Sequence, residues 1–536
     1  MYPLVALKDN DGGTFMKMIT RIIALCIIMA TLVGCFAGCG SKNSATTGGN
    51  AANEVEISVW NAGNGVAWLE AAINAFNAKQ SDWFVYYVAS ADNASVKTTY
   101  GLADADSIDL YMSTKVFDTS HMEPLDDVLE STAKGDTKTI GEKFDAQYLE
   151  YEQAADGHYY TLTWGGGALG IVYNTRLFEQ AGIKQIPRTT NELSVVCDKL
   201  KEAGITPITH YRGDAERSTS GYWPYIQEQW AAQYDGWDYY MNTFYACTDA
   251  NGNSPSKDVL KNKDGRYQVL KAMEKFITPD YVQAGANAQN HITAQTSFLN
   301  TDIGMMVSGS WMANEMEGTG NAKDFAVMKT PIISGITDKL ETVKSDGQLR
   351  ELVSAIDAVI DGEADISTYQ SGDGYVVNGA TISSADWEYV KNARSMVATN
   401  YPQMSVFIPS YSDAKDGAKE FLKFFYSDAG YKIFRDTLHI SLPISFCEGE
   451  VDTEGWTRFE TDMDNMFNSA IYNINRNPMK INRIFTDGGA TPYGYVSFVE
   501  YFSANNPNDR INAEEAWNRI IEEIDNYYDQ WLMNIQ

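Results

Sequence analysis

The sequence predicts an α/β fold with two or more lobes, in which parallel β-sheets are covered by helices. Its 536 residues exceed what one hydrophobic core usually supports, so the chain is expected to divide into separate lobes. Beyond residue 53, segments in which apolar and polar residues alternate are followed by segments with apolar residues at helical spacing. Strand, helix and strand at this pitch are typical of βαβ units in a parallel sheet.

The first such unit is expected between residues 54 and 113. Alternation predicts a strand at 54–60, and a turn follows it at Gly63–Gly65. Two further apolar segments, at 83–89 and 107–113, are predicted to be the second and third strands. The helix between the first two strands is predicted by apolar residues at helical spacing, which are Val66, Leu69, Ile73 and Phe76.

Four later strands and three later helices are predicted in the same way. One helix is expected to begin after Thr190, because threonine often caps a helix N-terminus. A charged segment at 337–371 interrupts the pattern and is expected to be a mostly helical insertion. The strands are expected at 159–164, 170–174, 302–311 and 325–332, and the other two helices around 418–425 and 513–524.

The first 53 residues are predicted to be a targeting segment rather than part of the fold. An apolar run at 22–33 follows two basic residues, and as a helix it would span about 18 Å. A hydrocarbon core is about 30 Å thick, so the run is too short for a membrane span. Basic residues, a short apolar run and then small residues are the pattern of a secretory signal peptide. Met16 or Met18 therefore makes a better translation start than Met1.

Two cysteines follow the apolar run. Leu32-Val33-Gly34-Cys35 resembles the bacterial lipobox, in which the cysteine is lipidated and becomes the mature N-terminus. Cys39 is the alternative, because a flexible Gly-Ser-Lys-Asn stretch follows it. We expect a leader and lipoprotein signal peptide over 1–39 and a flexible tether over 40–53. The mature protein is then expected outside the cytoplasm, anchored by lipid at the bacterial cell surface or periplasmic face of the membrane.

The composition excludes several classes of function. A formal net charge of −30 argues against nucleic acid as a partner, because phosphate backbones are bound by basic surfaces. The five histidines show no metal-ligand spacing, and neither do Cys197, Cys247 and Cys447, which are expected to be buried small apolar side chains. We therefore predict no metal and no cofactor.

Catalytic signatures are also missing. The chain has no H-E-x-x-H, no G-x-S-x-G and no P-loop, so no enzyme is predicted. Among 71 acidic residues a glycosidase pair could always be proposed, because sequence does not set the distance between two carboxylates. A secreted carbohydrate-active enzyme therefore remains the alternative function.

The run Gly165-Gly166-Gly167 formally begins a G-x-G-x-x-G pattern. A dinucleotide site needs a helix to open directly after the glycines, so that its N-terminal amides hold the pyrophosphate. The residues that follow, 171–174, are β-branched and extended in character. The run is better explained as a bend between strands, close to a ligand.

Aromatic residues are the most informative side chains. Residues 220–240 contain eight Tyr and Trp, which at helical spacing can equally be core residues. Tyr and Trp also combine flat apolar faces with polar tips, which suits stacking on sugar rings. Trp60 and Trp311, at the ends of predicted strands, invite the same interpretation, since ligands of parallel α/β sheets bind beyond the carboxyl ends of strands.

Three segments together resemble the extracellular solute-binding protein family 1, the sugar-binding lipoproteins of ABC importers, to which maltose-binding protein is distantly related. They are DGHYYTLTWGGGALGIVYNTRLFEQAGI, AQTSFLNTDIGMMVSGSW and AKEFLKFFYSDAGYKIF, in this order behind the lipobox. The resemblance covers essentially 54–536. It departs from the family at Thr161, Thr163 and Thr301-Asp302, where Gly, Pro and Gly-Lys are usual.

The resemblance implies a two-lobed, periplasmic-binding-protein-like (type II) fold with a hinge and a ligand cleft between the lobes. By segment matching, 54–163 and 334–440 would form lobe one, and 164–333 and 441–536 lobe two. The resemblance implies a carbohydrate ligand, delivered to the transmembrane subunits of an ABC permease, and a monomer. The implied cleft residues are Trp60, Asn61, Asp109, Trp164, Gly165, Tyr222, Trp223, Ser310, Trp311, Asp373 and Tyr375. A peptide or polyamine ligand on the same fold is the further alternative.

Overall fold

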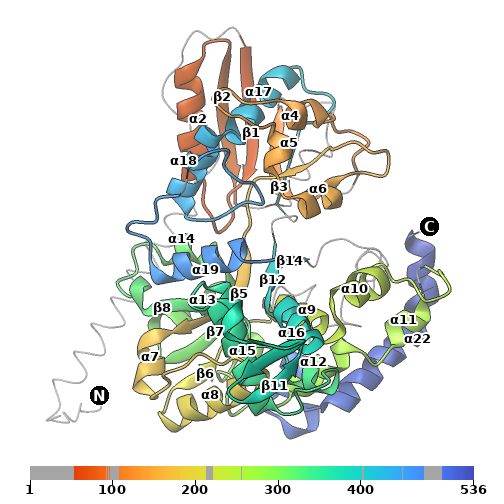
Figure 1. The fold of residues 1–536 in the computed structure, drawn as a ribbon. Helices are drawn as coiled ribbons and strands as arrows, with labels where there is room; N and C mark the ends of the chain where they lie inside the picture. Colours follow the sequence, from red (N-terminus) through yellow and green to blue (C-terminus); the bar gives the residue numbers. More distant parts are fainter. Residues whose placement is uncertain are drawn as a thin grey trace, which may run out of the picture.

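The computed structural model describes residues 53–91, 93, 96, 100, 108–116, 118–212, 221–254, 256–400, 404–449, 451–475 and 498–535. The predicted signal peptide, the two candidate lipidation residues Cys35 and Cys39, and the tether up to residue 52 lie outside this range. The described chain forms two lobes, one above the other in Figure 1, each with a β-sheet covered by helices. The α/β class and the two-lobed arrangement predicted from the sequence are confirmed.

The upper lobe is built on a five-stranded sheet in the order β2-β1-β3-β13-β4. The strands β1, β2 and β3 are parallel, as the βαβ pattern predicts, whereas β13 is antiparallel to both of its neighbours. Helices that are far apart in the sequence pack together in this lobe: in Figure 1 the blue α17 and α18 lie beside the red α2. The strands are β1 (Asn53–Trp60), β2 (Trp83–Ser90), β3 (Leu110–Thr114), β4 (Leu162–Thr163) and β13 (Met404–Phe407), and the helices α2 (Ala67–Lys79), α4 (Asp126–Glu130), α5 (Ile140–Lys143), α6 (Ala146–Glu152), α17 (Lys415–Phe425) and α18 (Asp428–Leu438).

The lower lobe contains a mixed sheet in the order β14-β12-β5-β7-β6, with β8 also paired to β5. The strand β5 is antiparallel to β7, β8 and β12, which corrects the prediction of purely parallel sheets. The reason is that the chain enters this lobe from the upper one through β5, whereas β7 runs back toward the upper lobe. The strands are β5 (Ala168–Asn174), β6 (Thr206–Ile208), β7 (Ile303–Gly309), β8 (Phe325–Met328), β12 (Met396–Thr399) and β14 (Tyr472–Asn475).

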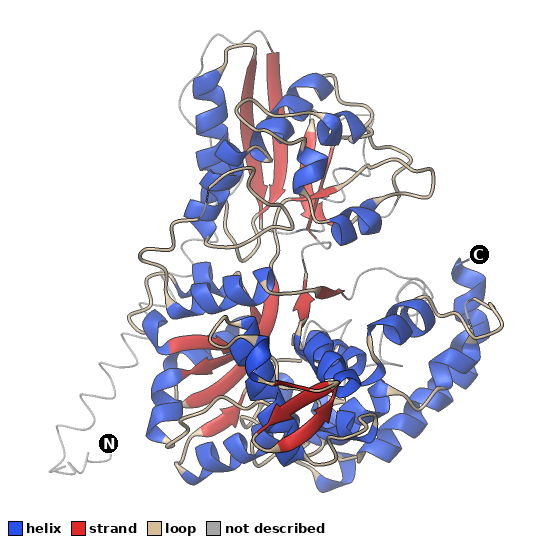
Figure 2. Ribbon diagram, in the orientation of Figure 1, coloured by secondary structure: helices blue, strands red, loops and turns tan. Residues whose placement is uncertain are grey.

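Helices surround the lower sheet, and a small antiparallel sheet of β9, β10 and β11 lies at the front of this lobe (Figure 2). The N-cap of α8 is Thr189 rather than Thr190, since the Thr189 side chain accepts the Glu192 N–H at 3.3 Å. The small sheet comprises β9 (Gln370–Ser371), β10 (Gly374–Val377) and β11 (Ala380–Ser383). The helices are α7 (Thr175–Gln180), α8 (Thr190–Glu202), α9 (Trp223–Asp235), α10 (Trp237–Tyr239), α11 (Lys257–Lys261), α12 (Gly265–Met273), α13 (His291–Asn300), α14 (Met312–Met316), α15 (Asp346–Ile360), α16 (Ser384–Arg394), α19 (Arg458–Asn468), α21 (Val499–Phe502) and α22 (Ala513–Ile535).

The lobe boundaries differ from those predicted. The sequence places 334–440 in lobe one, but the structure divides this segment, and 334–399 pack in the lower lobe. Val343, Leu352 and Trp387 are buried in the same hydrophobic core as Trp230 of α9. The apolar faces of α15 and α16 are covered there, and the chain returns to the upper lobe only with β13.

The other two crossings also lie later than expected. Trp164 is buried in the upper core, so the first crossing follows it rather than precedes it. Leu442 and Ile444, predicted to lie in lobe two, are likewise buried in the upper core. The insertion itself is only partly helical, because β9 and β10 follow α15 within it.

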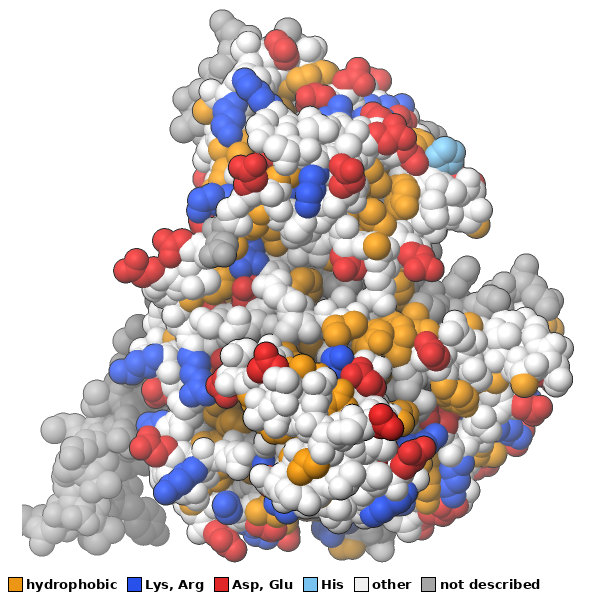
Figure 3. Space-filling model, in the orientation of Figure 1, with side chains coloured by type: hydrophobic (Ala, Val, Ile, Leu, Met, Phe, Trp, Pro, Cys, Tyr) orange, Lys and Arg blue, Asp and Glu red, His pale blue; other side chains and the backbone are white. Residues whose placement is uncertain are grey.

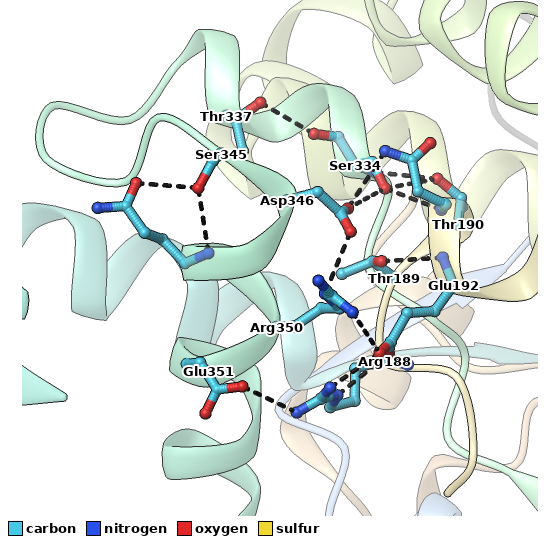
Figure 4. Close-up of polar contacts among 12 residues, drawn as sticks. Arg188, Thr189, Thr190, Glu192, Ser334, Thr337, Ser345, Asp346, Arg350 and Glu351 are labelled. Atoms are coloured by element: carbon cyan, nitrogen blue, oxygen red, sulfur yellow. Dashed lines mark hydrogen bonds and ion pairs between the residues drawn. The ribbon is translucent and has the colours of Figure 1, made fainter. Parts of the chain in front are cut away.

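A polar network ties the insertion to the lower lobe (Figure 4). Glu192 of α8 receives Arg188 Nη2 at 2.8 Å and Arg350 Nη1 of α15 at 3.1 Å. Asp346, at the start of α15, accepts the Ser334 hydroxyl at 2.8 Å. Burial alone would raise the pKa of Glu192, yet hydrogen bonds from the two arginines hold it below its usual value. These contacts explain why α15 belongs to the lower lobe.

Asp235 is predicted to make the stability of the lower lobe depend on pH. It lies at the end of α9, where its two oxygens accept the Gly265 N–H of α12, each at 3.0 Å. Burial, and next the negative charge of Asp264, raise the pKa of Asp235 to about 7. The folded state therefore holds a proton that the unfolded state releases near pH 4.

The stability that this proton on Asp235 contributes is fully present below about pH 4 and is lost as the pH rises through about 7. Over that range the free energy of unfolding should fall by at most about 1.4 kcal/mol per pH unit. We expect Asp235→Asn to remove that slope in urea unfolding measured from pH 4 to 8. The matched control is Asp238→Asn, three residues further on and exposed, which should keep it. An unchanged slope in Asp235→Asn would contradict the assignment.

Candidate ligand-binding site

The chain crosses between the lobes three times, from β4 to β5, from β12 to β13 and from α18 to α19. At this junction β1 of the upper sheet and β7 of the lower sheet both end. Trp60 closes β1 and is followed by a loop at 61–65, and Gly309 closes β7 and is followed by α14. The carboxyl ends of strands are where α/β proteins bind ligands, so both lobes present such an edge to the same region.

The loop after β1 touches α14 directly. The Asn314 side-chain amide donates to the Gly63 carbonyl at 2.7 Å. A Cβ at Gly63 would lie 2.8 Å from Glu315 Oε1 and 2.9 Å from Trp311 Cδ1. A larger residue at this position would have to displace Glu315 or Trp311, so glycine permits the close approach that brings the upper lobe onto the face of the lower lobe that carries Trp311.

The glycine run forms the first crossing, as predicted for a bend between strands. Gly167 has φ +143°, and a Cβ there would lie 1.9 Å from Ser310 Oγ. The Asn400 N–H of the second crossing donates to the Gly167 carbonyl at 3.1 Å. Ser310 Oγ donates to the Ala168 carbonyl at 3.3 Å. Gly165 is buried beside Asn64, so the two predicted residues Gly165 and Ser310 do lie at the junction.

Aromatic side chains gather on the lower lobe here. The rings of Tyr222 and Trp311 are 4.9 Å apart at 62°, and Tyr211 packs edge-on against Tyr222 at 5.9 Å. Tyr225 completes the group at 6.3 Å from Tyr222. These residues come from the ends of β6 and β7 and the start of α9, so distant segments build one aromatic face. Tyr222 and Trp311 remain half-buried.

From the upper lobe, Trp60 and Asn61 lie at the carboxyl end of β1. Trp60 is half-buried and packs against the upper core, while Asn61 is exposed. The Asn61 backbone N–H donates to the Ser90 carbonyl at 2.7 Å, which holds the residue at the end of β1. Both predicted residues are therefore positioned at the edge where the lobes meet.

Two predicted ligand-stacking tryptophans are core residues instead. Trp164 is fully buried, stacks on Trp68 at 5.5 Å and 18°, and donates its Nε1–H to the Ser113 carbonyl at 3.0 Å. Trp223 is 2% exposed and packs against Trp230 and Phe276 in the lower core. Their ring faces are occupied by protein, so neither is available to stack on a ligand.

Three further predicted residues lie away from the junction. Asp109 precedes β3 at the amino end of the strand, where its oxygens accept the Glu56 N–H at 2.9 Å and the Ser412 hydroxyl at 2.6 Å. Tyr375 of the small front sheet stacks on Trp387 at 4.1 Å. Asp373, in the turn before β10, is exposed. Asp109 lies at the amino end of its strand, which is the end remote from the junction. Asp373 and Tyr375 lie in the insertion, which packs in the lower lobe and not in lobe one as predicted.

Sequence reasoning missed four polar residues at the junction. Their side-chain oxygens are buried and have no hydrogen-bond partner among the described residues. An acceptor buried without a partner costs about 1–3 kcal/mol, so such atoms indicate where a ligand or water donates. The four atoms are Asn64 Oδ1, Glu315 Oε2, Asn400 Oδ1 and Asn473 Oδ1.

Two of these residues had a sequence signal. Asn64 stands between two glycines directly after the first predicted strand, and Glu315 is one helical turn beyond Trp311. Asn400 and Asn473 lie at the end of β12 and in β14, which the predicted boundaries assign to different lobes. All four groups are acceptors, so the junction is chemically suited to a ligand rich in hydrogen-bond donors.

One cluster of metal-ligating types occurs among the described residues, formed by Asp136, Asp428 and Cys447. Lys143 Nζ already lies 2.7 Å from Asp136 Oδ2 and 2.7 Å from Asp428 Oδ1. The ammonium therefore supplies the positive charge that a cation would bring. No described helix combines the length and apolar character that crossing a bilayer requires.

Comparison with known proteins agrees with this architecture. A family model for the bacterial extracellular solute-binding proteins matches residues 60–432, well over half of the chain. Putative binding proteins of Brucella abortus (strain 2308) and Brucella suis biovar 1 (strain 1330) are 23% identical over 209 residues. That alignment covers 39% of this chain and 44% of each relative, so the chain matches less than half the length of these curated relatives.

Solved structures share the fold over nearly their whole length. The bacterial solute receptor AcbH gives a TM-score of 0.57 at 12% identity, covering 88% of this chain and 99% of that one. Maltose-bound MalE3 of T. maritima gives 0.55 at 14% identity, with 88% and 99% covered. A chitin oligosaccharide binding protein gives 0.55 at 14%, with 89% and 99% covered. With its two lobes, its three crossings and this family match, the chain belongs to the bacterial extracellular solute-binding protein family.

Proposed function

We propose that the protein is the extracytoplasmic substrate-binding subunit of an ABC importer and captures an oligosaccharide between its lobes. The observation that carries the proposal is the junction itself, where an aromatic face lies beside buried oxygen acceptors to which no described residue donates. Sugar hydroxyls donate to such acceptors, and the C–H faces of sugar rings stack on Tyr and Trp. Similar folds carry such ligands: AcbH prefers b-D-galactopyranose, and MalE3 was solved with maltose.

The proposed site keeps Trp60, Asn61, Gly165, Tyr222, Ser310 and Trp311 from the sequence prediction. It adds the acceptors Asn64, Glu315, Asn400 and Asn473. It leaves out the predicted residues that lie in a core or away from the junction, which are Trp164, Trp223, Asp109, Asp373 and Tyr375. The ligand would contact both lobes at once, which favours the conformation in which they are closed together. Closure of this kind about a hinge is common in two-lobed binding proteins, and no bond is made or broken.

The closed form would then dock on the transmembrane subunits of the permease and release the sugar to them. We propose that a monomer does this while anchored to the membrane by lipid on Cys35, or on Cys39. The mass of the mature N-terminal peptide distinguishes the two cysteines. A glycosidase would instead turn over a chromogenic glycoside, and a polyamine or peptide receptor would respond to those ligands and not to sugars.

A thermal-shift screen tests the ligand class, because a ligand that binds only the folded state raises the apparent stability. Galactose, maltose, raffinose and chitin oligosaccharides are the first probes. A ligand at 100 times its dissociation constant should stabilise the protein by about 2.7 kcal/mol. If no sugar shifts the melting temperature while a peptide or polyamine does, the carbohydrate assignment is wrong.

Trp311→Ala is expected to weaken binding of the sugar found in that screen about 10- to 100-fold, which corresponds to about 1.4–2.8 kcal/mol. The reason is the loss of the half-buried ring at the lobe junction, and isothermal titration calorimetry measures the change in affinity. Trp83→Ala is the matched control, since Trp83 is also half-buried but begins β2 at the opposite end of the upper sheet. Equal losses of affinity in both variants would contradict the site.

A further inference from the structure

Glu315 is the one acidic side chain among the unpartnered groups at the described part of the junction. It lies on α14 one turn after Trp311, and its Oε1 faces the Gly63 backbone of the upper lobe. Its Oε2 is buried and has no hydrogen-bond partner among the described residues. The carboxyl group therefore lies between the lobes, and no described residue donates a hydrogen bond to its Oε2.

No lysine, arginine or histidine of the described chain forms an ion pair with Glu315, although ion pairs are numerous elsewhere. The comparison with Lys143 is informative, because there a buried cation is held by two carboxylates within 2.7 Å. At Glu315 the anion is buried, and no basic side chain among the described residues pairs with it. A buried charge without a partner is costly, so such a group is normally neutralised or paired.

The surroundings of Glu315 are aromatic rather than basic. Its negative charge acts on Tyr211 and Tyr222 and contributes, after burial, to raising the pKa of each phenol. Burial raises the pKa of Glu315 itself, and a hydrogen bond from Gln295 lowers it only in part. Rings of Tyr and Trp beside a carboxylate are the surroundings in which a protonated amine binds, through charge-assisted hydrogen bonds and cation–π attraction.

We infer that Glu315 forms a subsite for a protonated amine, so that the preferred ligand is an amino sugar or an oligosaccharide that contains one. This inference rests on the proposed function and refines its ligand class. A neutral hydroxyl satisfies a lone pair of Oε2 but brings no positive charge, whereas an ammonium group does both. The net charge of −30 adds to the preference, since it favours approach of a cationic ligand over a neutral one.

The specificity is expected to depend on the lobes closing. When they separate, the Gly63 loop leaves α14 and the carboxylate is solvated. When they close on a ligand, the carboxylate returns to a buried environment, where an ion pair is stronger than in water. The amine is therefore recognised mainly in the closed state, which makes closure itself selective for the basic ligand.

The test compares sugars that differ only by an amine in place of one hydroxyl on each ring. The pairs are galactose with galactosamine, glucose with glucosamine, and cellobiose with the fully deacetylated disaccharide of glucosamine, each titrated calorimetrically into the purified protein at pH 7. In a pair that binds, we expect the amine to bind at least 10-fold more tightly than its neutral partner. Glu315→Gln should reduce this ratio to near one, because it should weaken binding of the amine about 10-fold more than binding of the neutral sugar.

Glu317→Gln is the matched control, because Glu317 follows the same helix, is exposed and should leave the ratio unchanged. The unliganded melting temperature of Glu315→Gln should equal or exceed that of the parent, since the variant removes a buried charge. A neutral sugar that binds as tightly as its amine overturns the inference and leaves the proposed function intact. An equal loss for both sugars in Glu315→Gln also overturns it, because that is the result of a purely structural role. If sugars of neither kind bind, the proposed function fails as well.

Discussion

Replacing Lys143 with alanine is expected to lower the free energy of unfolding by about 3–5 kcal/mol. The Lys143 side chain is fully buried, and its ammonium donates to Asp136 Oδ2, to Asp428 Oδ1 and to the Tyr426 carbonyl at 2.7, 2.7 and 2.9 Å. Without the ammonium, Asp136 is left as a buried and uncompensated charge. The network also joins parts of the chain nearly 300 residues apart, so its loss affects the whole upper lobe.

Urea unfolding measures this effect, with Lys423→Ala as the control. Lys423 pairs with Glu420 at 2.9 Å on the exposed face of α17, where an ion pair contributes about 0–1 kcal/mol. Burial alone would raise the pKa of Asp428, but Lys143 and the Cys447 N–H hold it below its usual value, so the Asp428 carboxylate is ionised at neutral pH. A loss below about 1 kcal/mol in Lys143→Ala would show that the network is replaceable by water.

The second large effect is expected where α18 of the upper lobe meets α19 of the lower lobe. Arg435 Nη1 lies 2.9 Å from Asp464 Oδ1, and both side chains are nearly buried. Beside them His439 Nδ1 lies 2.7 Å from Glu460 Oε1, and the His439 ring stacks on Trp456 at 4.7 Å. These contacts form a clasp between the lobes. We expect Arg435→Ala to lower the free energy of unfolding by about 3 kcal/mol, because it leaves Asp464 as a nearly buried carboxylate without its arginine.

A double-mutant cycle isolates the clasp from other effects of the substitution. Arg435→Ala and Asp464→Ala should show a coupling energy of at least about 1.5 kcal/mol in urea unfolding. Lys432 and Asp436, on the solvent side of the same helix, lie 2.7 Å apart but are exposed, and their coupling should stay below about 0.5 kcal/mol. If the two couplings are equal, burial at the lobe junction does not strengthen the pair.

Local patterns predict much of the fold. Alternation along 54–60 identifies β1, and apolar spacing identifies α2, α17 and α22, because these elements bury one face each. Local patterns do not show which distant strands pair with each other in a sheet. β13 enters the upper sheet between β3 and β4, and nothing in the local sequence at 404–407 indicates that neighbour. The lobe boundary near 334 is missed for the same reason.

The site shows where such reasoning stops. Trp311 and Tyr222 are found, because aromatic residues at the ends of elements suggest stacking. Trp164 and Trp223 have the same local signature, yet they face inward, and periodicity does not say which tryptophan faces a core. Asn400 and Glu315 are ordinary polar residues in the sequence. They become notable only when folding buries their oxygens with no donor among the described residues, which is a property of tertiary structure.

The position of β13 has a consequence for how the protein is made. The upper sheet lacks the strand between β3 and β4 until residue 407 has been synthesised, and its covering helices extend to residue 438. Residues 53–163 therefore leave the ribosome without the strand that joins β3 to β4. Contacts over such sequence separations slow folding, since a long loop must close before any of them forms. The upper lobe completes only when about four fifths of the polypeptide has been synthesised, so this lobe cannot finish folding until late in synthesis.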